Sequence, residues 1–134
     1  MIVHDVTPIL NVSSLRESFA WFEKLGWHQR WAHGEPPTFG AVGAGQAEIF
    51  LCQDGQGARG GPMSREPWDN QAGSTWMTWW VGSPAEVDAV YALATKLGIV
   101  APWPPTDMPW GVHECHIRHP DGHMFRVTSR LEEA

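Results

Sequence analysis

The hydrophobic positions in the first part of the chain predict one helix flanked by strands. Residues 5–12 form an extended apolar run. The next apolar residues recur every three or four positions, as on one face of a helix: Leu15, Phe19, Phe22 and Leu25. Ser14 and Glu17 form a capping box at the start of this helix, and Gly26 is placed to end it. Three extended segments follow, at residues 27–34, 37–45 and 47–53.

The same order recurs in the second half of the chain. Residues 76–82 have the pattern of a strand, and Ser83, Pro84 and Glu86 are typical of the start of a second helix. The apolar stripe of this helix is Val87, Val90, Tyr91, Ala94 and Leu97. Gly98 is placed to end it. Extended segments then follow at residues 99–105, 111–118 and 123–129, with a hairpin turn at Asp121-Gly122 between the last two.

These patterns predict an α+β fold built from two βαβββ modules. Module 1 covers about residues 1–53 and module 2 about residues 74–130, within a single domain of residues 1–134. Residues 54–73 between the modules are rich in glycine and polar side chains, which is typical of a linker.

Composition narrows the class of protein. Hydrophobic residues make up 43% and charged residues 18%, which is typical of a folded domain. The formal net charge is −6 and no basic run occurs, so we expect no nucleic-acid partner. No signal peptide opens the chain and no apolar run approaches a membrane span of about 18 residues. Cys52 and Cys115 form no disulfide framework, so we expect a cytoplasmic protein.

Tryptophan is the unusual feature of the composition, with nine residues against one tyrosine. Core packing alone explains this poorly, because a buried indole N–H needs a hydrogen-bond partner. In the segment STWMTWWVG, residues 74–82, alternation puts Trp76 and Trp80 on one face of a strand and Met77 and Trp79 on the other. We expect the second face to pack under the helix and the first to face a cavity.

Two segments resemble the vicinal oxygen chelate superfamily, which includes glyoxalase I, extradiol dioxygenases and bleomycin resistance proteins. They are NVSSLRESFAWFEKLGW near the start and PWGVHECHIRHPDGHMFRVTS at the end. The resemblance is closest to the metal-free bleomycin resistance subgroup. It implies that the two modules form U-shaped mixed sheets around a cleft, and that modules pair across a homodimer.

The resemblance also locates the positions that hold a divalent metal in the enzymes of the superfamily. By counting from the helix caps and the Asp-Gly turn, they fall on Thr7, Trp76 and Arg126, and the first module keeps only Glu48 as a candidate ligand. A catalytic site needs about three ligands with N, O or S donors. We therefore expect no metal, no cofactor and no catalytic residue, and we expect Glu48 and Arg126 to form an ion pair in the former metal position.

The remaining aromatic residues outside the core favour a ligand pocket. Trp103 and Trp110 bracket PPTDMP, which we expect to be a proline-stiffened loop beside the cavity, and Trp68 in the linker either closes over the ligand or holds the linker to the domain. The predicted pocket residues are Trp31, Phe39, Glu48, Phe50, Trp68, Trp76, Trp80, Trp103, Trp110 and Arg126.

The leading hypothesis is a metal-independent binding protein that sequesters a bulky aromatic, antibiotic-like molecule. The acidic net charge tilts this prediction towards a cationic ligand. The alternative is a metal-dependent glyoxalase- or dioxygenase-type enzyme of the same superfamily, which predicts stoichiometric metal. A third hypothesis is an interaction module without a small ligand, which predicts an exposed tryptophan patch.

Histidine and cysteine allow other chemistry to be weighed. His113 and His116 fall on opposite faces of a strand and cannot chelate together, whereas His113 and Cys115 share a face but are too few for a metal site. Cys115 has acid and base neighbours, but a buried structural cysteine is the commoner outcome. His119 and His123 flank the hairpin turn, where we expect them to be solvated.

Overall fold

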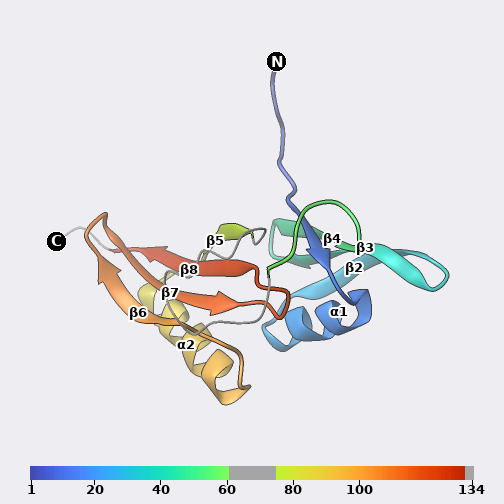
Figure 1. Cartoon of the computed structure of the whole chain (residues 1–134). Coiled ribbons are helices and arrows are strands. Elements are labelled where there is room, and N and C mark those ends of the chain that lie inside the picture. The colour runs from blue at the N-terminus through green and yellow to red at the C-terminus, as the bar shows by residue number, and fades with distance from the viewer. Residues whose placement is uncertain (61–74, 132–134) are drawn as a thin grey trace. The chain divides into compact units, whose positions relative to one another are not determined.

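The computed structural model describes residues 1–60 and 75–131, and the chain divides into two compact units, Met1–Ala58 and Arg59–Ala134 (Figure 1). Within these described residues, each unit contains one helix and one four-stranded mixed sheet. The predicted α+β fold with two βαβββ modules is therefore confirmed. Pairing with a second copy of the chain stays a prediction. No helix within the described residues is long and apolar enough to cross a membrane.

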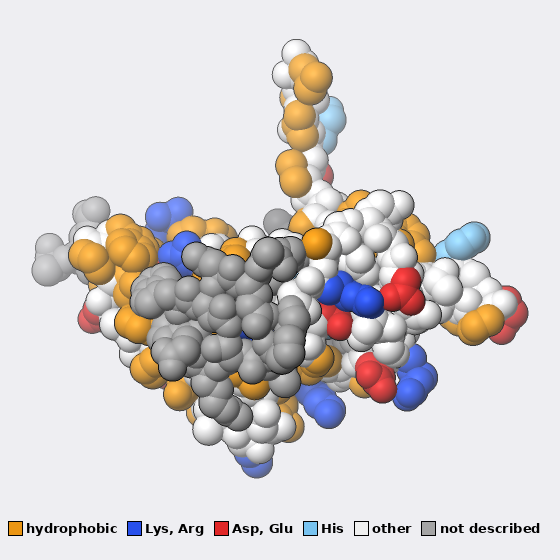
Figure 2. Space-filling view, viewed as in Figure 1, with side chains coloured by type: hydrophobic (Ala, Val, Ile, Leu, Met, Phe, Trp, Pro, Cys, Tyr) orange, Lys and Arg blue, Asp and Glu red, His pale blue; other side chains and the backbone are white. Residues whose placement is uncertain are grey.

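The first unit contains a helix on one face of a sheet with the strand order β1-β4-β3-β2. Strand β1 runs parallel to β4, and the other neighbours are antiparallel. Its elements are β1 (Ile9–Val12), α1 (Leu15–Lys24), β2 (His28–Gly34), β3 (Pro37–Ala44) and β4 (Ala47–Gln53). The segment before β1 extends away from it with its apolar side chains exposed (Figure 2).

The second unit repeats this arrangement with the strand order β5-β8-β7-β6. Strand β5 runs parallel to β8, and β7 is antiparallel to both β6 and β8. Its elements are β5 (Trp76–Trp80), α2 (Pro84–Lys96), β6 (Trp103–Met108), β7 (Val112–Arg118) and β8 (Met124–Arg130).

Both helices begin at the predicted serine caps. The Ser14 hydroxyl accepts a hydrogen bond of 3.2 Å from the backbone N–H of Glu17, and the Ser83 hydroxyl accepts one of 3.3 Å from Glu86. These bonds satisfy donors that the first helical turn leaves open. After each helix a glycine has a positive φ, 95° at Gly26 and 74° at Gly98, which L-residues rarely adopt.

The core of each unit lies between its sheet and its helix. In the first unit the fully buried side chains include Leu10, Val12, Leu15, Phe22 and Leu51. In the second they include Val87, Ala94, Cys115, Phe125 and Val127. Trp79 stacks on Phe125 at 4.3 Å between ring centroids, so this indole does point to the helix side of the sheet as predicted. Trp76 and Trp80 therefore lie on the opposite face.

Two local predictions are wrong. Most of the segment predicted as a proline-stiffened loop forms strand β6, Trp103–Met108, paired with β7. The second error concerns His119 and His123, which are 1% and 0% exposed rather than solvated. Hydrogen bonds to their ring nitrogens explain this burial. Nδ1 of His119 accepts the backbone N–H of Asp121 at 3.0 Å, and Nδ1 of His123 accepts that of Thr75 at 3.2 Å. Neutral imidazoles with these partners can be buried at the hairpin turn.

Candidate functional site

The face of the second sheet that points away from α2 brings together charged and aromatic side chains. In the strand register Arg126 lies between Thr78 of β5 and His116 of β7, so all three share one face. Glu114 lies two residues from His116 and therefore also projects from this face.

Glu114 is the centre of a buried polar cluster on this face. Arg126 donates to its carboxylate through Nε at 3.0 Å and Nη2 at 2.8 Å, a bidentate pair. Nε2 of His116 lies 2.8 Å from the same carboxylate. The side chains of Glu114 and His116 are each 1% exposed, whereas that of Arg126 is 33% exposed.

The protonation of this cluster follows from its contacts. Burial would raise the pKa of the Glu114 carboxyl, but the hydrogen bonds from Arg126 and His116 outweigh burial and hold the pKa below its usual value. Burial lowers the pKa of His116 despite its bond to Glu114. At neutral pH the cluster therefore contains a carboxylate, a guanidinium and a neutral imidazole.

Three tryptophans lie beside this cluster, and a fourth lies further along the same unit. The ring of Trp76 lies edge-on to His116, with centroids 5.6 Å apart, and Trp103 lies 6.1 Å from the same imidazole. The indole of Trp110 lies 5.9 Å from the Arg126 guanidinium. Trp80 lies 4.7 Å from the guanidinium of Arg130, further along β8. All four of these tryptophans are among the predicted pocket residues.

The first unit has an aromatic cluster of its own. Trp31, Phe39 and Phe50 contact one another edge to face, with ring centroids 5.3 to 5.6 Å apart. They lie on the sheet face opposite α1, and Trp31 is 38% exposed. Glu48 shares this face and forms an ion pair of 3.4 Å with Arg30. The structure thus brings together the predicted first-module residues on one sheet face.

Within the units, Glu48 forms an ion pair with Arg30, and Arg126 forms one with Glu114. The expected ion pair between Glu48 and Arg126 stays a prediction. The strand register shows which positions of the two units are equivalent. Ile9 lies five residues before the capping Ser14 and pairs with Phe50 in the first unit. Thr78 lies five residues before the capping Ser83 and pairs with Arg126 in the second unit. The first-module equivalent of Arg126 is therefore Phe50, and Glu48 lies two residues before it.

The residues that the resemblance places at the metal positions of the superfamily do not fit a divalent ion. Thr7 is a poor ligand, and neither Phe50 nor the indole of Trp76 offers a lone pair for coordination. Arg126 adds a positive charge where a carboxylate would be needed. In the parts of the chain that the structure describes, no group of three His, Cys, Asp or Glu side chains is arranged to hold a metal.

Sequence reasoning missed three contributors to the site, Glu114, His116 and Arg130. Alternation along residues 111–118 and 123–129 was sufficient to place Glu114 and His116 on the face of Arg126, because the hairpin turn fixes the register. Trp68, the remaining predicted pocket residue, lies outside the described residues.

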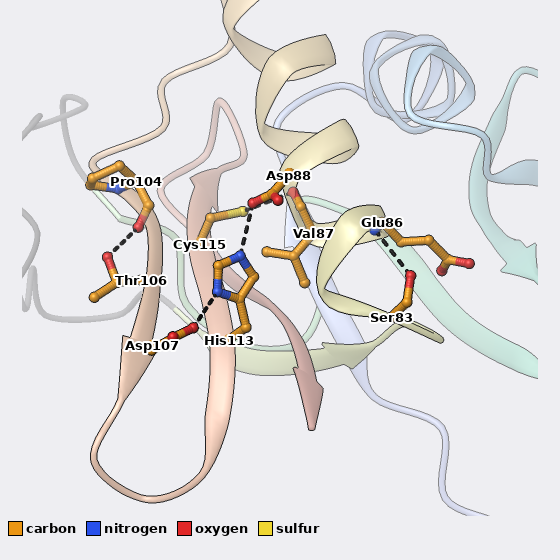
Figure 3. A network of polar contacts seen from close by, with 9 residues as sticks. All are labelled: Ser83, Glu86, Val87, Asp88, Pro104, Thr106, Asp107, His113 and Cys115. Atoms are coloured by element: carbon orange, nitrogen blue, oxygen red, sulfur yellow. Dashed lines mark hydrogen bonds and ion pairs between the residues drawn. The ribbon is translucent and has the colours of Figure 1, made fainter. Parts of the chain in front are cut away.

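A second polar cluster lies on the helix side of the same sheet (Figure 3). The imidazole of His113 bridges two carboxylates, with Nδ1 2.7 Å from Asp107 on β6 and Nε2 2.8 Å from Asp88 on α2. The hydrogen bond to Asp88 is the main reason why the pKa of His113 is raised. Burial raises the pKa of the nearby Cys115 thiol to about 12, so this cysteine is no nucleophile at neutral pH.

Comparison with known proteins places the chain in a family. A family model described as Glyoxalase/Bleomycin resistance protein/Dioxygenase superfamily matches residues 2–127. A comparison with curated protein sequences found no match.

Several solved structures share the fold. A bleomycin resistance determinant encoded on the transposon Tn5 is 16% identical, over 96% of this chain and 98% of that chain, with a TM-score of 0.68. TioX from Micromonospora sp. ML1 is 17% identical over 93% and 97% of the two chains, with a TM-score of 0.72. A glyoxalase/bleomycin resistance protein/dioxygenase from Nocardioides is 19% identical over 100% and 89%, with a TM-score of 0.69. At these identities the likeness shows the fold, whereas the family model spans most of the sequence. The chain belongs to the glyoxalase/bleomycin resistance protein/dioxygenase superfamily.

Proposed function

We propose that this protein is a metal-independent binding protein that sequesters a bulky aromatic, antibiotic-like molecule in the cytoplasm. One observation carries the proposal. Arg126, paired with the buried Glu114, and the indole of Trp76 occupy positions that the resemblance to the superfamily assigns to metal ligands. Sequestration requires only a surface that competes with the target of the antibiotic, and it requires no metal.

The aromatic side chains supply that surface. The first sheet presents Trp31, Phe39 and Phe50 on the face opposite α1. The second unit presents Trp76, Trp80, Trp103 and Trp110 near His116, Arg126 and Arg130. An aromatic pair contributes about 0.5–1.5 kcal/mol beyond the burial of its area. Several such contacts to one planar ligand are enough for micromolar binding, which is about 8 kcal/mol.

The fold is compatible with this role. A protein with the same fold, the determinant from Tn5, is described as conferring bleomycin resistance, and we extend binding of this kind to the present chain as a hypothesis. We further propose that two copies of the chain form a symmetric dimer with two equivalent sites.

A fluorescence titration tests the proposal. Purified protein of known metal content is titrated with a panel of DNA-damaging antibiotics, and the ligand is recovered for mass spectrometry. We expect saturable quenching at low micromolar concentration, two ligands per dimer and an unchanged ligand mass. A stoichiometric divalent ion, together with a changed ligand mass that depends on this ion, overturns the proposal in favour of a metal-dependent enzyme.

Two substitutions, one in the turn between β6 and β7 and one on strand β5, separate binding from packing. Trp110→Phe changes an indole that is 57% exposed beside Arg126, and we expect it to weaken binding. Trp79→Phe is the matched control, because that indole stacks on Phe125 on the helix side of the sheet. Equal loss of affinity in both variants would indicate a general effect on the fold rather than a contact with the ligand.

A further inference from the structure

The guanidinium of Arg126 has hydrogen-bonding capacity that its partner does not use. Glu114 accepts from Nε and Nη2, which is one edge of the planar group. Nη1 makes no hydrogen bond to any side chain or backbone group of residues 1–60 and 75–131, and a third of the Arg126 side chain is exposed. Since guanidinium donors are arranged as a rigid fork, the remaining edge can bind two oxygen atoms side by side.

A second arginine lies on the same face of β8. Arg130 is four residues from Arg126, and alternation keeps both on the face opposite α2. Its guanidinium lies 4.7 Å from the ring of Trp80, and both residues line a hollow of about 390 Å³. The two arginines are thus each placed against an indole that is 57% exposed, Trp110 for Arg126 and Trp80 for Arg130.

The local charge of this face is opposite in sign to that of the whole chain. Arg126 and Arg130 contribute two positive charges and Glu114 contributes one negative charge, which leaves +1 among these three residues. The chain as a whole has a formal net charge of −6. Attraction acts over about 10 Å at ordinary ionic strength, so a ligand on this face responds to the local charge.

We propose that this face, defined by Trp80, Trp110, Arg126 and Arg130, binds an aromatic molecule that carries an oxyanion with paired oxygens, such as a carboxylate. The oxyanion accepts hydrogen bonds from the free edge of Arg126, and the aromatic ring lies against the exposed indoles. This inference rests on the proposed binding function and replaces the cationic ligand that net charge favoured. Stacking needs a planar ring, and the arginine fork needs paired oxygens, so the two features select one ligand class together.

A pair of probes that differ only in charge tests the inference. Anthracene carboxylate and anthracenylmethylammonium offer the same ring with opposite charge, and their affinities for the full chain are measured by isothermal titration calorimetry. We expect the carboxylate to bind about tenfold more tightly, because a hydrogen bond between charged groups is stronger than a contact with the ring alone.

Three variants assign the difference to the arginines. Arg126→Lys keeps the charge and a bond to Glu114 but removes the free edge of the fork, and Arg130→Gln removes an exposed charge away from the buried pair. Each is expected to weaken binding of the carboxylate about fivefold or more without weakening binding of the ammonium. Arg16→Gln is the control for Arg130→Gln, because both substitutions remove one positive charge. Arg16 is 87% exposed on α1 of the other unit. Circular dichroism verifies that each variant is folded. If Arg126→Lys does not fold, Arg130→Gln alone tests the inference.

The outcomes separate the inference from the proposed function. Equal affinities, a preference for the ammonium, or carboxylate binding that neither arginine variant weakens overturns the inference, while the binding of aromatic ligands stands. If neither probe binds, the inference also fails, and the antibiotic titration decides independently whether the protein is a binding protein at all.

Discussion

Arg126 and Glu114 form a bidentate ion pair across strands β7 and β8, with the carboxylate almost completely buried and the guanidinium partly exposed. The pair lies two residues off direct register, since Glu114 is opposite Thr128 and Arg126 is opposite His116. This diagonal contact lets Glu114 bind both Arg126 and His116. Removing Glu114 therefore leaves two polar side chains without their buried partner.

We expect Glu114→Ala to lower the free energy of unfolding by about 2–3 kcal/mol, less than for a fully buried pair because Arg126 reaches solvent. The measurement is urea unfolding at pH 7. The control is Glu48→Ala, which removes a 3.4 Å pair between side chains that are 28% and 37% exposed and is expected to cost less than about 1 kcal/mol. Similar losses for the two variants would contradict a special role for the buried carboxylate.

The buried hairpin histidines predict sensitivity to acid. Burial, and then the neighbouring His123, lower the pKa of His119 from 6.5 to about 3. As pH falls below 6.5 the unfolded state takes up a proton that the folded state does not, so stability is lost progressively between about pH 6.5 and pH 3. We expect a loss that approaches about 1.4 kcal/mol per pH unit for this group, measured by urea unfolding at a series of pH values. In His119→Gln the slope should flatten over this range. An unchanged slope would show that another group causes the acid sensitivity.

His113 has the opposite dependence. Its pKa is raised, first by the hydrogen bond to Asp88 and, against burial, also by Asp107 (Figure 3). The charged imidazolium is therefore favoured in the folded state, and its contribution is present below pH 6.5 and is lost as pH rises through the folded-state pKa. An NMR titration of the histidine ring protons is expected to give a pKa above 6.5, which Asp88→Asn lowers more than Asp107→Asn. The reverse order would contradict the bridging geometry.

The sequence allowed the helices, their caps and most strands to be predicted because each depends on local chemistry. Each helix begins at a capping serine, Ser14 or Ser83, and is followed by a glycine with positive φ, Gly26 or Gly98. These signals and the apolar stripe between them involve residues that are close in sequence. The equivalence between positions of the two units depends on pairing between strands. The parallel ladders make Phe50 the equivalent of Arg126, and Glu48 lies two residues before Phe50.

Local sequence patterns also could not predict which polar side chains are buried. His119 and His123 flank a polar turn whose sequence predicts exposure to solvent, whereas hydrogen bonds from the backbone N–H groups of Asp121 and Thr75 allow both rings to be buried. The relation of Glu114 to Arg126 was accessible in principle, because the turn at residues 121–122 fixes the pairing of β7 with β8.

The two cysteines are predicted to differ in reactivity. Cys115 is 0% exposed on the helix side of β7, and burial raises the pKa of its thiol to about 12, whereas Cys52 on β4 is half-buried. Because the thiolate is the reacting form, native protein should react with a disulfide reagent at Cys52 alone. We expect Cys52→Ser to abolish the reaction in native protein and Cys115→Ser to leave it unchanged, with both thiols reacting after unfolding in urea. Rapid reaction of the native Cys52→Ser variant would mean that the interface between α2 and β7 opens to solvent, and the packing of Cys115 against Val87 would then not hold in solution.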